Sequence, residues 1–365
     1  MNGPGRLRSG DAGFVLVIVL MLLVVLTLLA SAAGTAGSRA VASTQEEIDR
    51  FQGQLDMAST AETVRYMMVT QRTNLGGLSV VQAPPATAAE LDADTDGESA
   101  LPLGNEIRLD GQPYAGIGNA VFAIQDDAGL LSPNWAQPAM LAAFFASRGA
   151  PATQWAELEA KRLDYQDPDS LHRLGGAEAG DYAEAGLPPP SNRTLATPLE
   201  FRRILQWSRL LEGMDDAQLL GTLSIERNAV LNVNTAPAGV LALLPGMDRA
   251  NAERMVALRT LAPFRSTWKL AESFPIPPES VDALTLFSSR SANLILWDRR
   301  LGGHRLVHWT STPYDLAGIP WRTDYEVSLP NDPQSDRPVA EAPESPLFAP
   351  QDPGGTGRQR VATGR

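Results

Sequence analysis

The sequence predicts an α+β fold, in which a long N-terminal helix packs on an antiparallel sheet and a large all-α domain is inserted into that sheet. Three features of the sequence indicate this arrangement. An apolar run near the N-terminus continues as an amphipathic run without a proline, residues 130–278 have helical patterning, and strand-like segments flank that block on both sides. A helical block between two sheet-forming segments of one chain is most simply an insertion.

The composition argues against several kinds of site and several classes of function. The chain has 365 residues, enough for a substantial core, and no cysteine, which excludes disulfides and thiolate metal sites. Its formal charge of −12 repels phosphate backbones, so we expect no nucleic acid as a partner. Three histidines leave little for a histidine-centred catalytic site, and we expect a structural role for His304 and His308. The sequence has no nucleophile elbow, Walker loop or dinucleotide fingerprint, so we expect no enzyme.

The first predicted element is an apolar helix that can span a membrane. Residues 14–33 are apolar except at Thr27 and Ser31, and such a run at about 1.5 Å per residue covers the roughly 30 Å hydrocarbon layer. A secretory signal peptide is the alternative, because Ala30–Ala32 forms a cleavage triplet. We favour a retained anchor, because the helical pattern continues well past the triplet.

The anchor is expected to continue as an amphipathic helix on the far side of the membrane. Arg6 and Arg8 precede the apolar run and favour a cytoplasmic N-terminus. Beyond Arg39 no proline occurs until Pro84. Apolar residues recur there every three or four positions, at Ile48, Phe51, Leu55, Ala58, Ala61, Val64 and Met68. We therefore expect one helix from Phe14 to about Arg72, with one half in the bilayer and the other against a globular head.

Two segments are expected to form the sheet. Residues 81–129 read as a connector followed by a hairpin, with turns at Asp110–Gly111 and Gly116–Gly118. Residues 279–330 return to strand chemistry and predict a second hairpin. Residues 331–365 are rich in proline, glycine and aspartate, so we expect a disordered tail.

The helical block contains two related stretches. "LLSPNWAQPAML" and "VLNVNTAPAGVL" match at an offset of 100 residues, which suggests two related helical units. In each, an asparagine (Asn134 and Asn234) precedes a helix-opening proline and is expected to cap the helix. The second stretch continues as "LALLPGMDRANAERMVALR", which resembles a helix-hairpin-helix element. Such an element can contact DNA, but Asp248 replaces a turn glycine, so we prefer a packing module.

The loop between these stretches carries candidate metal ligands. Asp164, Asp167, Asp169 and Glu178 are hard oxygen donors in a segment rich in glycine and proline, a composition that suits calcium. The alternative is a group of helix caps and exposed carboxylates. The residues by themselves favour this alternative.

The start of the sequence resembles the class III signal of type IV prepilins and of type II secretion pseudopilins. A short polar leader ends at Gly13, Phe14 follows, and an apolar helix runs into an amphipathic one. In that family a prepilin peptidase cuts between the glycine and the aromatic residue and methylates the new amino group. The resemblance implies cleavage after Gly13 and N-methylation of Phe14.

Further motifs are similar to the K subunit of the pseudopilins. Most pseudopilins carry a glutamate at the fifth mature position, and its absence, here Ile18, is a hallmark of K subunits. These subunits typically read D-W-x-D-x-D, then G-A-E, a Tyr, an Asn, a Leu-rich helix and N-x-N-T-A. The same order occurs here, with Tyr165 in place of the tryptophan, at Asp164, Asp167, Asp169, Gly176–Glu178, Tyr182, Asn192, Glu200–Leu205 and Asn232–Ala236.

The resemblance implies a pilin-like fold whose inserted domain holds calcium through Asp164, Asp167, Asp169 and Glu178. It implies a minor pseudopilin at the tip of the periplasmic pseudopilus of a type II secretion system, which initiates or caps assembly and helps to export folded proteins across the outer membrane. Expected partners are the other minor pseudopilins of a tip complex, the prepilin peptidase and the inner membrane, which the chain crosses once with its bulk in the periplasm. The alternative is a membrane-anchored DNA-binding or uptake protein that uses the helix-hairpin-helix-like element.

The resemblance and the patterns together divide the chain into seven parts. They are a prepilin leader (1–13), a transmembrane helix (14–38), the periplasmic amphipathic half of that helix (39–80), a connector with the first sheet segment (81–129), the inserted helical domain (130–278), the second sheet segment (279–330) and a disordered tail (331–365). The functional candidates therefore lie at the leader junction and in the inserted domain.

Overall fold

The long helix α1 (Asp11–Thr70) confirms the continuous N-terminal helix. The computed structural model describes residues 11–80, 101–300, 302–313, 315, 318–330, 338–345 and 347–348. The chain divides into two compact units, residues 1–55 and 56–365, and the boundary falls within α1. In the first unit the apolar side chains from Phe14 to Leu29 are exposed, and by length and composition this helix could cross a membrane. The predicted connector at 81–100 lies outside the described residues.

The second unit is built on a five-stranded antiparallel sheet with the strand order β10-β9-β8-β5-β4. The bounds of its strands are β4 (Asp110–Ala115), β5 (Ala120–Asp126), β8 (Ser291–Asp298), β9 (His304–Ser311) and β10 (Trp321–Leu329). A small sheet consists of β1 (Thr73–Asn74), β2 (Gly77–Ser79) and β3 (Glu106–Ile107). A parallel pair consists of β6 (Leu231–Asn232) and β7 (Leu284–Thr285). The predicted mixed α+β class is confirmed.

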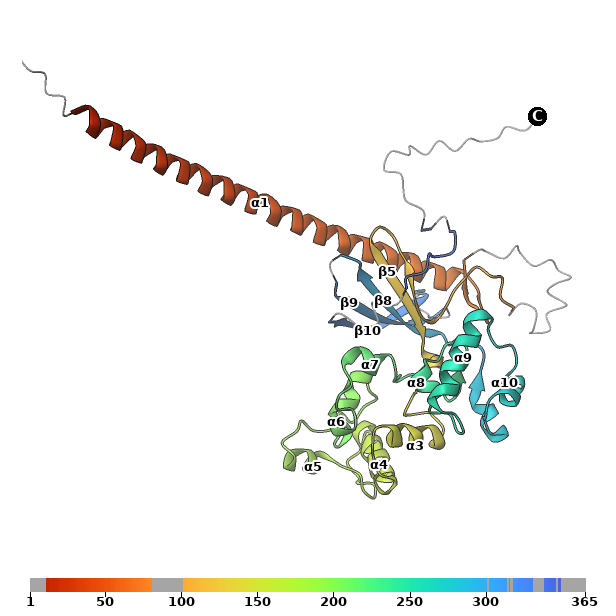
Figure 1. Cartoon of the computed structure of the whole chain (residues 1–365). Helices are drawn as coiled ribbons and strands as arrows, with labels where there is room; N and C mark the ends of the chain where they lie inside the picture. Colours follow the sequence, from red (N-terminus) through yellow and green to blue (C-terminus); the bar gives the residue numbers. More distant parts are fainter. Residues whose placement is uncertain are drawn as a thin grey trace, which may run out of the picture. The chain divides into compact units, whose positions relative to one another are not determined.

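The helices α3 to α10 gather in one group, formed by the chain between β5 and β8 (Figure 1). The α-helices are α3 (Pro138–Ser147), α4 (Trp155–Gln166), α5 (Ala179–Glu184), α6 (Trp207–Leu210), α7 (Asp216–Leu220), α8 (Ala238–Leu241), α9 (Arg249–Leu261) and α10 (Thr267–Ser273). Short 3₁₀ helices are η1 (Asp127–Gly129), η2 (Ala152–Gln154), η3 (Pro198–Arg203) and η4 (Pro278–Ala283). The predicted insertion is present. The second sheet-forming segment first contributes η4 and β7, which join the helical block, and the five-stranded sheet resumes at Ser291.

The sheet and the helical block each have their own core. In the block, the ring of Phe201 stacks on Trp207 at 5.1 Å, and Trp207 Nε1 donates a hydrogen bond to the carbonyl of Leu158 at 2.9 Å. In the sheet, one face packs against Val64 and Met67 of α1 through Phe122, Ile124, Leu294, Leu296 and Trp309. Full burial of a large apolar side chain stabilises by roughly 1.5–3 kcal/mol, so the C-terminal end of α1 is an integral part of the second unit.

A glycine turn fastens the sheet to α1. Residues Gly116–Gly118 connect β4 with β5, as predicted. Asp56 Oδ2 accepts a hydrogen bond from the amide of Asn119 and Thr60 Oγ1 accepts one from the amide of Ile117, both at 3.0 Å. Gly118 has a φ of 61°, and a Cβ there would lie 2.2 Å from Asp56 Oδ2. The close approach of turn and helix therefore requires glycine.

The predicted turn at Asp110–Gly111 is wrong. Both residues belong to β4, whose register with β5 shifts between Asp110 and Pro113. Gly111 has a φ of 79°, and a glycine with positive φ serves a β-bulge as well as a turn. The sequence pattern does not distinguish these two uses.

Part of the predicted disordered tail is ordered. Within residues 338–345, Ala340 forms a parallel bridge with Tyr114 on the edge of β4. The amide of Ala115 donates to the Ala340 carbonyl at 2.9 Å, and Phe348 stacks on Phe122 at 5.5 Å. One exposed strand edge and one aromatic ring are enough to order a proline-rich segment. The remainder of the predicted tail lies outside the described residues.

The carboxylate of Asp126, at the end of β5, joins the sheet to the inserted block. It is 1% exposed and accepts five hydrogen bonds. Oδ1 accepts from the amide of Ala128 and from the amide and hydroxyl of Ser289, and Oδ2 accepts from Asn232 and Thr235. Burial raises the pKa of Asp126, and these donors counteract that effect.

We expect Asp126→Ala to lower the free energy of unfolding by at least about 3 kcal/mol, because it leaves several buried donors without an acceptor. Thermal and urea unfolding of the full-length chain in detergent, followed by tryptophan fluorescence, measures the loss. Asp282→Ala is the matched control, since Asp282 is exposed and we expect a change within about 0.5 kcal/mol. Equal stability of the two variants would contradict this account.

Candidate functional site

The predicted acidic ligands lie where α4 ends and α5 begins. Asp164 is on the last turn of α4, Asp167 is its C-cap residue, and Asp169 follows in the loop. Glu178 is the N-cap residue of α5, with its backbone amide bonded to Asp181 Oδ2 at 2.7 Å. Two helix ends and a short loop therefore bring together carboxylates that are up to fourteen positions apart.

Three of the four predicted residues converge. Asp167, Asp169 and Glu178 each offer one oxygen atom, and these three atoms lie within 4.8 Å of one another. Asp164 lies beside this group but is engaged elsewhere: its Oδ1 is 2.6 Å from Arg173 Nη1 and its Oδ2 accepts from the Arg173 amide at 3.2 Å. The spacing of the acids in the sequence does not show that Asp164 has a different partner from the other three.

The converging carboxylates have oxygens without donors among the described residues. Glu178 is 4% exposed, yet neither of its oxygens has a hydrogen-bond partner, and Asp167 Oδ1 also lacks one. Burial, together with the charges of Asp164 and Asp167, raises the pKa of Glu178. Unpaired buried carboxylate oxygens are costly, and they are the hard ligands that calcium coordinates. The residues present therefore fit a calcium ion.

Arg173 is a member of the site that the sequence interpretation missed. Its guanidinium forms ion pairs with Asp164 and Asp167, and these bonds raise the pKa of the arginine. It is the only lysine or arginine between Asp167 and Glu178, and that is the signal that could have identified it. Arg173 neutralises part of the acidic group and leaves Asp169 and Glu178 without a cationic partner among the described residues.

The loop around the acids is held from the other side by Asn192. Its backbone is left-handed, with a φ of 48°, and its amide donates to the Tyr165 carbonyl at 3.1 Å. Its Nδ2 donates to the carbonyl of Asp169, also at 3.1 Å. Tyr165, which stands where K subunits have tryptophan, is 3% exposed and lies 6.1 Å from the ring of Tyr182. The tyrosine ring thus packs in the core of the helical block, while the Tyr165 carbonyl holds Asn192.

The helix-hairpin-helix-like element consists of α8, a tight turn and α9. Gly246 in the turn has a φ of 77°, and a Cβ there would lie 1.9 Å from the carbonyl oxygen of Pro275. Asp248 caps α9, with its Oδ1 accepting from the amide of Asn251 at 2.8 Å. A carboxylate thus stands at the helix N-terminus where such hairpins can bind a phosphate. The geometry favours packing over contact with DNA.

The side chains of Asn134 and Asn234 do not cap the following helices, contrary to the prediction. The residues that precede α3 and α8 supply no side-chain cap. Asn234 instead accepts from the amide of Phe264 at 2.8 Å and donates to its carbonyl at 3.0 Å, and Asn134 bonds to Gln166. Tertiary partners outcompete the local cap, because the fold brings a distant backbone segment within reach.

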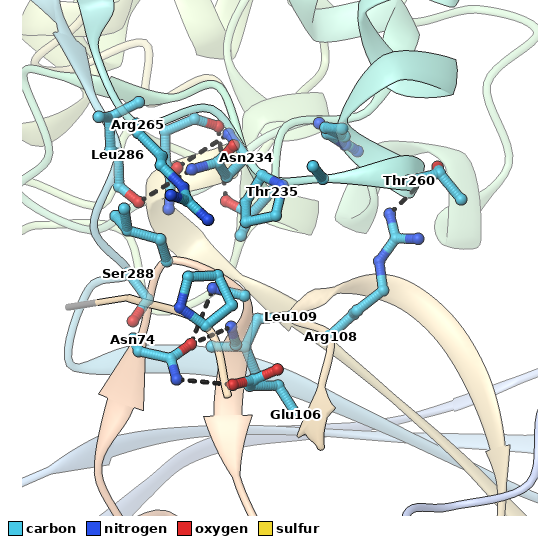
Figure 2. A pocket seen from close by; sticks show the side chains of 18 of the residues that line it. Asn74, Glu106, Arg108, Leu109, Asn234, Thr235, Thr260, Arg265, Leu286 and Ser288 are labelled. Atoms are coloured by element: carbon cyan, nitrogen blue, oxygen red, sulfur yellow. Dashed lines mark hydrogen bonds between the residues drawn. The ribbon is translucent and has the colours of Figure 1, made fainter. Parts of the chain in front are cut away.

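A cavity of about 570 Å³ lies between the small sheet and the hairpin element (Figure 2). On one wall Asn74 Nδ2 donates to Glu106 Oε1 at 2.8 Å. On the other wall, Asn234 Nδ2 donates hydrogen bonds to the carbonyls of Phe264 and Leu286. Figure 2 labels Asn234 and Leu286. These polar groups are satisfied within the protein, so we assign the cavity no ligand.

His308 occupies an unexpected setting on β9. It is 1% exposed, its Nε2 lies 2.6 Å from Asp127 Oδ2, and its Nδ1 lies 3.0 Å from Asp324 Oδ2. Burial alone would lower the pKa of His308, but the hydrogen bonds with the two carboxylates outweigh burial and raise it to about 9. Both ring nitrogens of this buried histidine are thus engaged by carboxylates.

Residues 231–283, which contain β6, α8, α9, α10 and η4, match the model of the family "Type II secretion system (T2SS), protein K". Arg259 of α9 holds this segment together, because it donates to the carbonyls of Val233 and Ala236. The resemblance to the K subunits is confirmed. The matched residues include the N-x-N-T-A motif and the helix-hairpin-helix-like element, so this segment is similar to a type II secretion protein.

Among solved structures, the chain is similar to one titled "The Crystal Structure of the GspK-GspI-GspJ complex from enterotoxigenic Escherichia coli Type 2 Secretion System". The sequence identity is 15%, and the alignment covers 60% of this chain and 82% of the other, with a TM-score of 0.39. No curated protein matches this chain.

We expect Gly246→Ala to destabilise the helix-hairpin-helix-like element by at least about 2 kcal/mol, because alanine there meets both the positive φ and the Pro275 carbonyl. Gly239→Ala in α8 is the matched control. A Cβ there has no atom within 4 Å, so we expect it to stabilise by about 0.5 kcal/mol. Urea unfolding of both variants measures the difference, and a neutral Gly246→Ala would refute the packing role of the turn.

Proposed function

We propose that this chain is a minor pseudopilin at the tip of the periplasmic pseudopilus of a type II secretion system. The observation that carries the proposal is the joint presence, in one chain, of the K-family segment at 231–283 and an N-terminal helix apolar and long enough to cross a membrane. In this role the protein initiates or caps the pseudopilus and supports export of folded proteins across the outer membrane. It does so as an assembly protein, without a chemical reaction of its own.

The apolar helix supplies the argument for the tip. An ionisable group in the bilayer is expensive and needs a partner, and in pilins a glutamate at the fifth mature position is thought to meet the N-terminal amine of the subunit ahead. Ile18 stands at that position when cleavage follows Gly13. A subunit with no neighbour ahead of it has no need of the carboxylate, and the bulk of the inserted domain discourages another subunit from stacking there.

The same proposal names partners and location. The partners are the other minor pseudopilins of a tip complex and the prepilin peptidase. The chain crosses the inner membrane once, with its N-terminus in the cytoplasm and its bulk in the periplasm, as Arg6 and Arg8 before the apolar run favour.

We further propose that Asp167, Asp169 and Glu178 hold calcium, with Asp164 supporting the site through Arg173. The unpaired buried oxygens of Glu178 support this proposal. A bound calcium ion supplies positive charge to the buried carboxylates and cross-links the end of α4 with the start of α5. With calcium bound, folding no longer leaves a buried carboxylate charge uncompensated, and the loop between α4 and α5 is held in place.

The N-terminus of the mature protein tests the pseudopilin proposal. We expect a methylated Phe14 when the full-length chain is expressed with a prepilin peptidase, and an intact leader without it, as measured by intact mass and terminal sequencing. Gly13→Leu is expected to block cleavage, and Gly10→Leu in the same leader serves as the control. A terminus at Ala33 in the presence or absence of the peptidase would identify a secretory signal and overturn the proposal.

Calcium is expected to stabilise the full-length chain by about 2.7 kcal/mol at a hundred times its dissociation constant. Thermal unfolding with calcium and with a chelator measures this shift. We expect Glu178→Gln to abolish the shift and to leave the calcium-free protein at least as stable as the wild type, because it removes a buried charge. Asp282→Asn, in an exposed position, should keep the full shift. An undiminished shift in Glu178→Gln would show that the ion binds elsewhere.

A further inference from the structure

We propose that Asp127, Glu226 and His308 form a second cation site, suited to a transition-metal ion such as Zn²⁺ and separate from the acidic loop of α4 and α5. The three residues come from distant parts of the chain. Asp127 lies in η1, Glu226 in the loop after α7, and His308 on β9. One ligand atom from each lies within 4.8 Å of the others.

The imidazole of His308 is oriented as in many protein metal sites. Its Nε2 faces Asp127, while its Nδ1 lies 3.0 Å from Asp324 Oδ2. A metal-bound histidine usually donates its other N–H to a carboxylate in this way, which fixes the ring and strengthens it as a ligand. Tyr325 stacks on the ring at 4.6 Å, with an angle of 9° between the planes. The ring is therefore already fixed in place before any ion binds.

The orienting carboxylate is itself held. Thr310 Oγ1 donates to Asp324 Oδ2 at 2.6 Å, and Arg322 Nε donates to Oδ1 at 2.5 Å. Both oxygens of Asp324 are thus engaged, which leaves Asp127 and Glu226 as the carboxylates that can approach an ion at Nε2. The carboxylate that orients the His308 ring is therefore in place before an ion enters.

The cluster carries more negative than positive charge. Three carboxylates (Asp127, Glu226 and Asp324) surround one imidazole and one guanidinium, that of Arg322. Within the part of the chain that the structure describes, the carboxylate of Glu226 forms neither a hydrogen bond nor an ion pair. A proton on Nε2 balances only one of the remaining charges. A divalent ion between Nε2, Asp127 and Glu226 balances the charges of both carboxylates, and the convergence of the three ligand atoms is the reason to expect an ion here.

The ligand set indicates the kind of ion. One imidazole nitrogen and two carboxylates suit Zn²⁺, whereas calcium takes six to eight oxygen ligands. Glu226 and Asp324 also line an open cavity of about 700 Å³, so this side of the cluster borders solvent. The site joins η1 and the loop after α7, in the inserted block, to β9 of the sheet, so a bound ion would cross-link the two cores.

The test is zinc binding to the full-length chain in detergent, stripped of metal with a chelator and then kept in excess calcium. Competition with a chromogenic chelator gives the affinity and the number of zinc ions per chain. We expect one saturable site in the wild type and at least a tenfold weaker affinity in Glu226→Gln and in His308→Gln. Glu212→Gln and His172→Gln, at exposed positions, are the matched controls and should bind as the wild type does.

Glu226→Gln decides the question if His308→Gln fails to fold, because the Glu226 carboxylate makes no hydrogen bond that the described structure would lose. Zinc binding that is absent, that is unchanged in Glu226→Gln, or that disappears in excess calcium would overturn the proposal. In each of those cases His308 is only an imidazolium held by two carboxylates. None of these outcomes bears on the role of the chain in secretion, since the site rests on none of the K-family motifs.

Discussion

The carboxylate of Asp126 is the point at which the two cores of the second unit become one structure. The strand β5 ends there and the helical block begins there. The donors come from η1, from Asn232 and Thr235 of the block, and from Ser289, which lies just before β8. Asn232 and Thr235, two of these donors, belong to the motif that matches the K family. The motif therefore has a structural role. It supplies hydrogen-bond donors to a buried carboxylate, whose burial without donors would strongly destabilise the fold. Residues within the segment that matches the family model thus also stabilise the junction of the two cores.

Local sequence patterns were sufficient to predict most of the fold. The long helix follows from apolar spacings of three and four, β5 and β8 follow from short apolar runs, and the turn at Gly116–Gly118 follows from a residue that alone tolerates it. Patterns failed where one residue type has two uses. Gly111 forms a bulge in place of a turn, and Asn234 bonds to Phe264 in place of its own helix. In both cases the distant strand or backbone that decided the outcome is absent from any local window.

The sequence was enough to predict which acidic residues of the loop are candidate ligands, but not which of them pair with an arginine. Asp167, Asp169 and Glu178 were recognisable as hard donors, and the structure brings them together. The diversion of Asp164 to Arg173 depends on the path of the loop, which the sequence does not specify. The cluster at His308 was still less accessible, because its members are separated by up to 181 positions and meet only after the sheet has formed.

The pairing of Asp126 with Ala292 has a consequence for how much the insertion can vary. The chain leaves β5 and returns to β8 at adjacent points, so the strands on either side are already the two arms of a hairpin. The entropy of closing a loop grows only with the logarithm of its length, so enlarging or shrinking residues 127–291 changes the cost of pairing these strands very little. The register of β5 and β8 is therefore insensitive to the length of the insertion, as long as the insertion keeps the donors to Asp126.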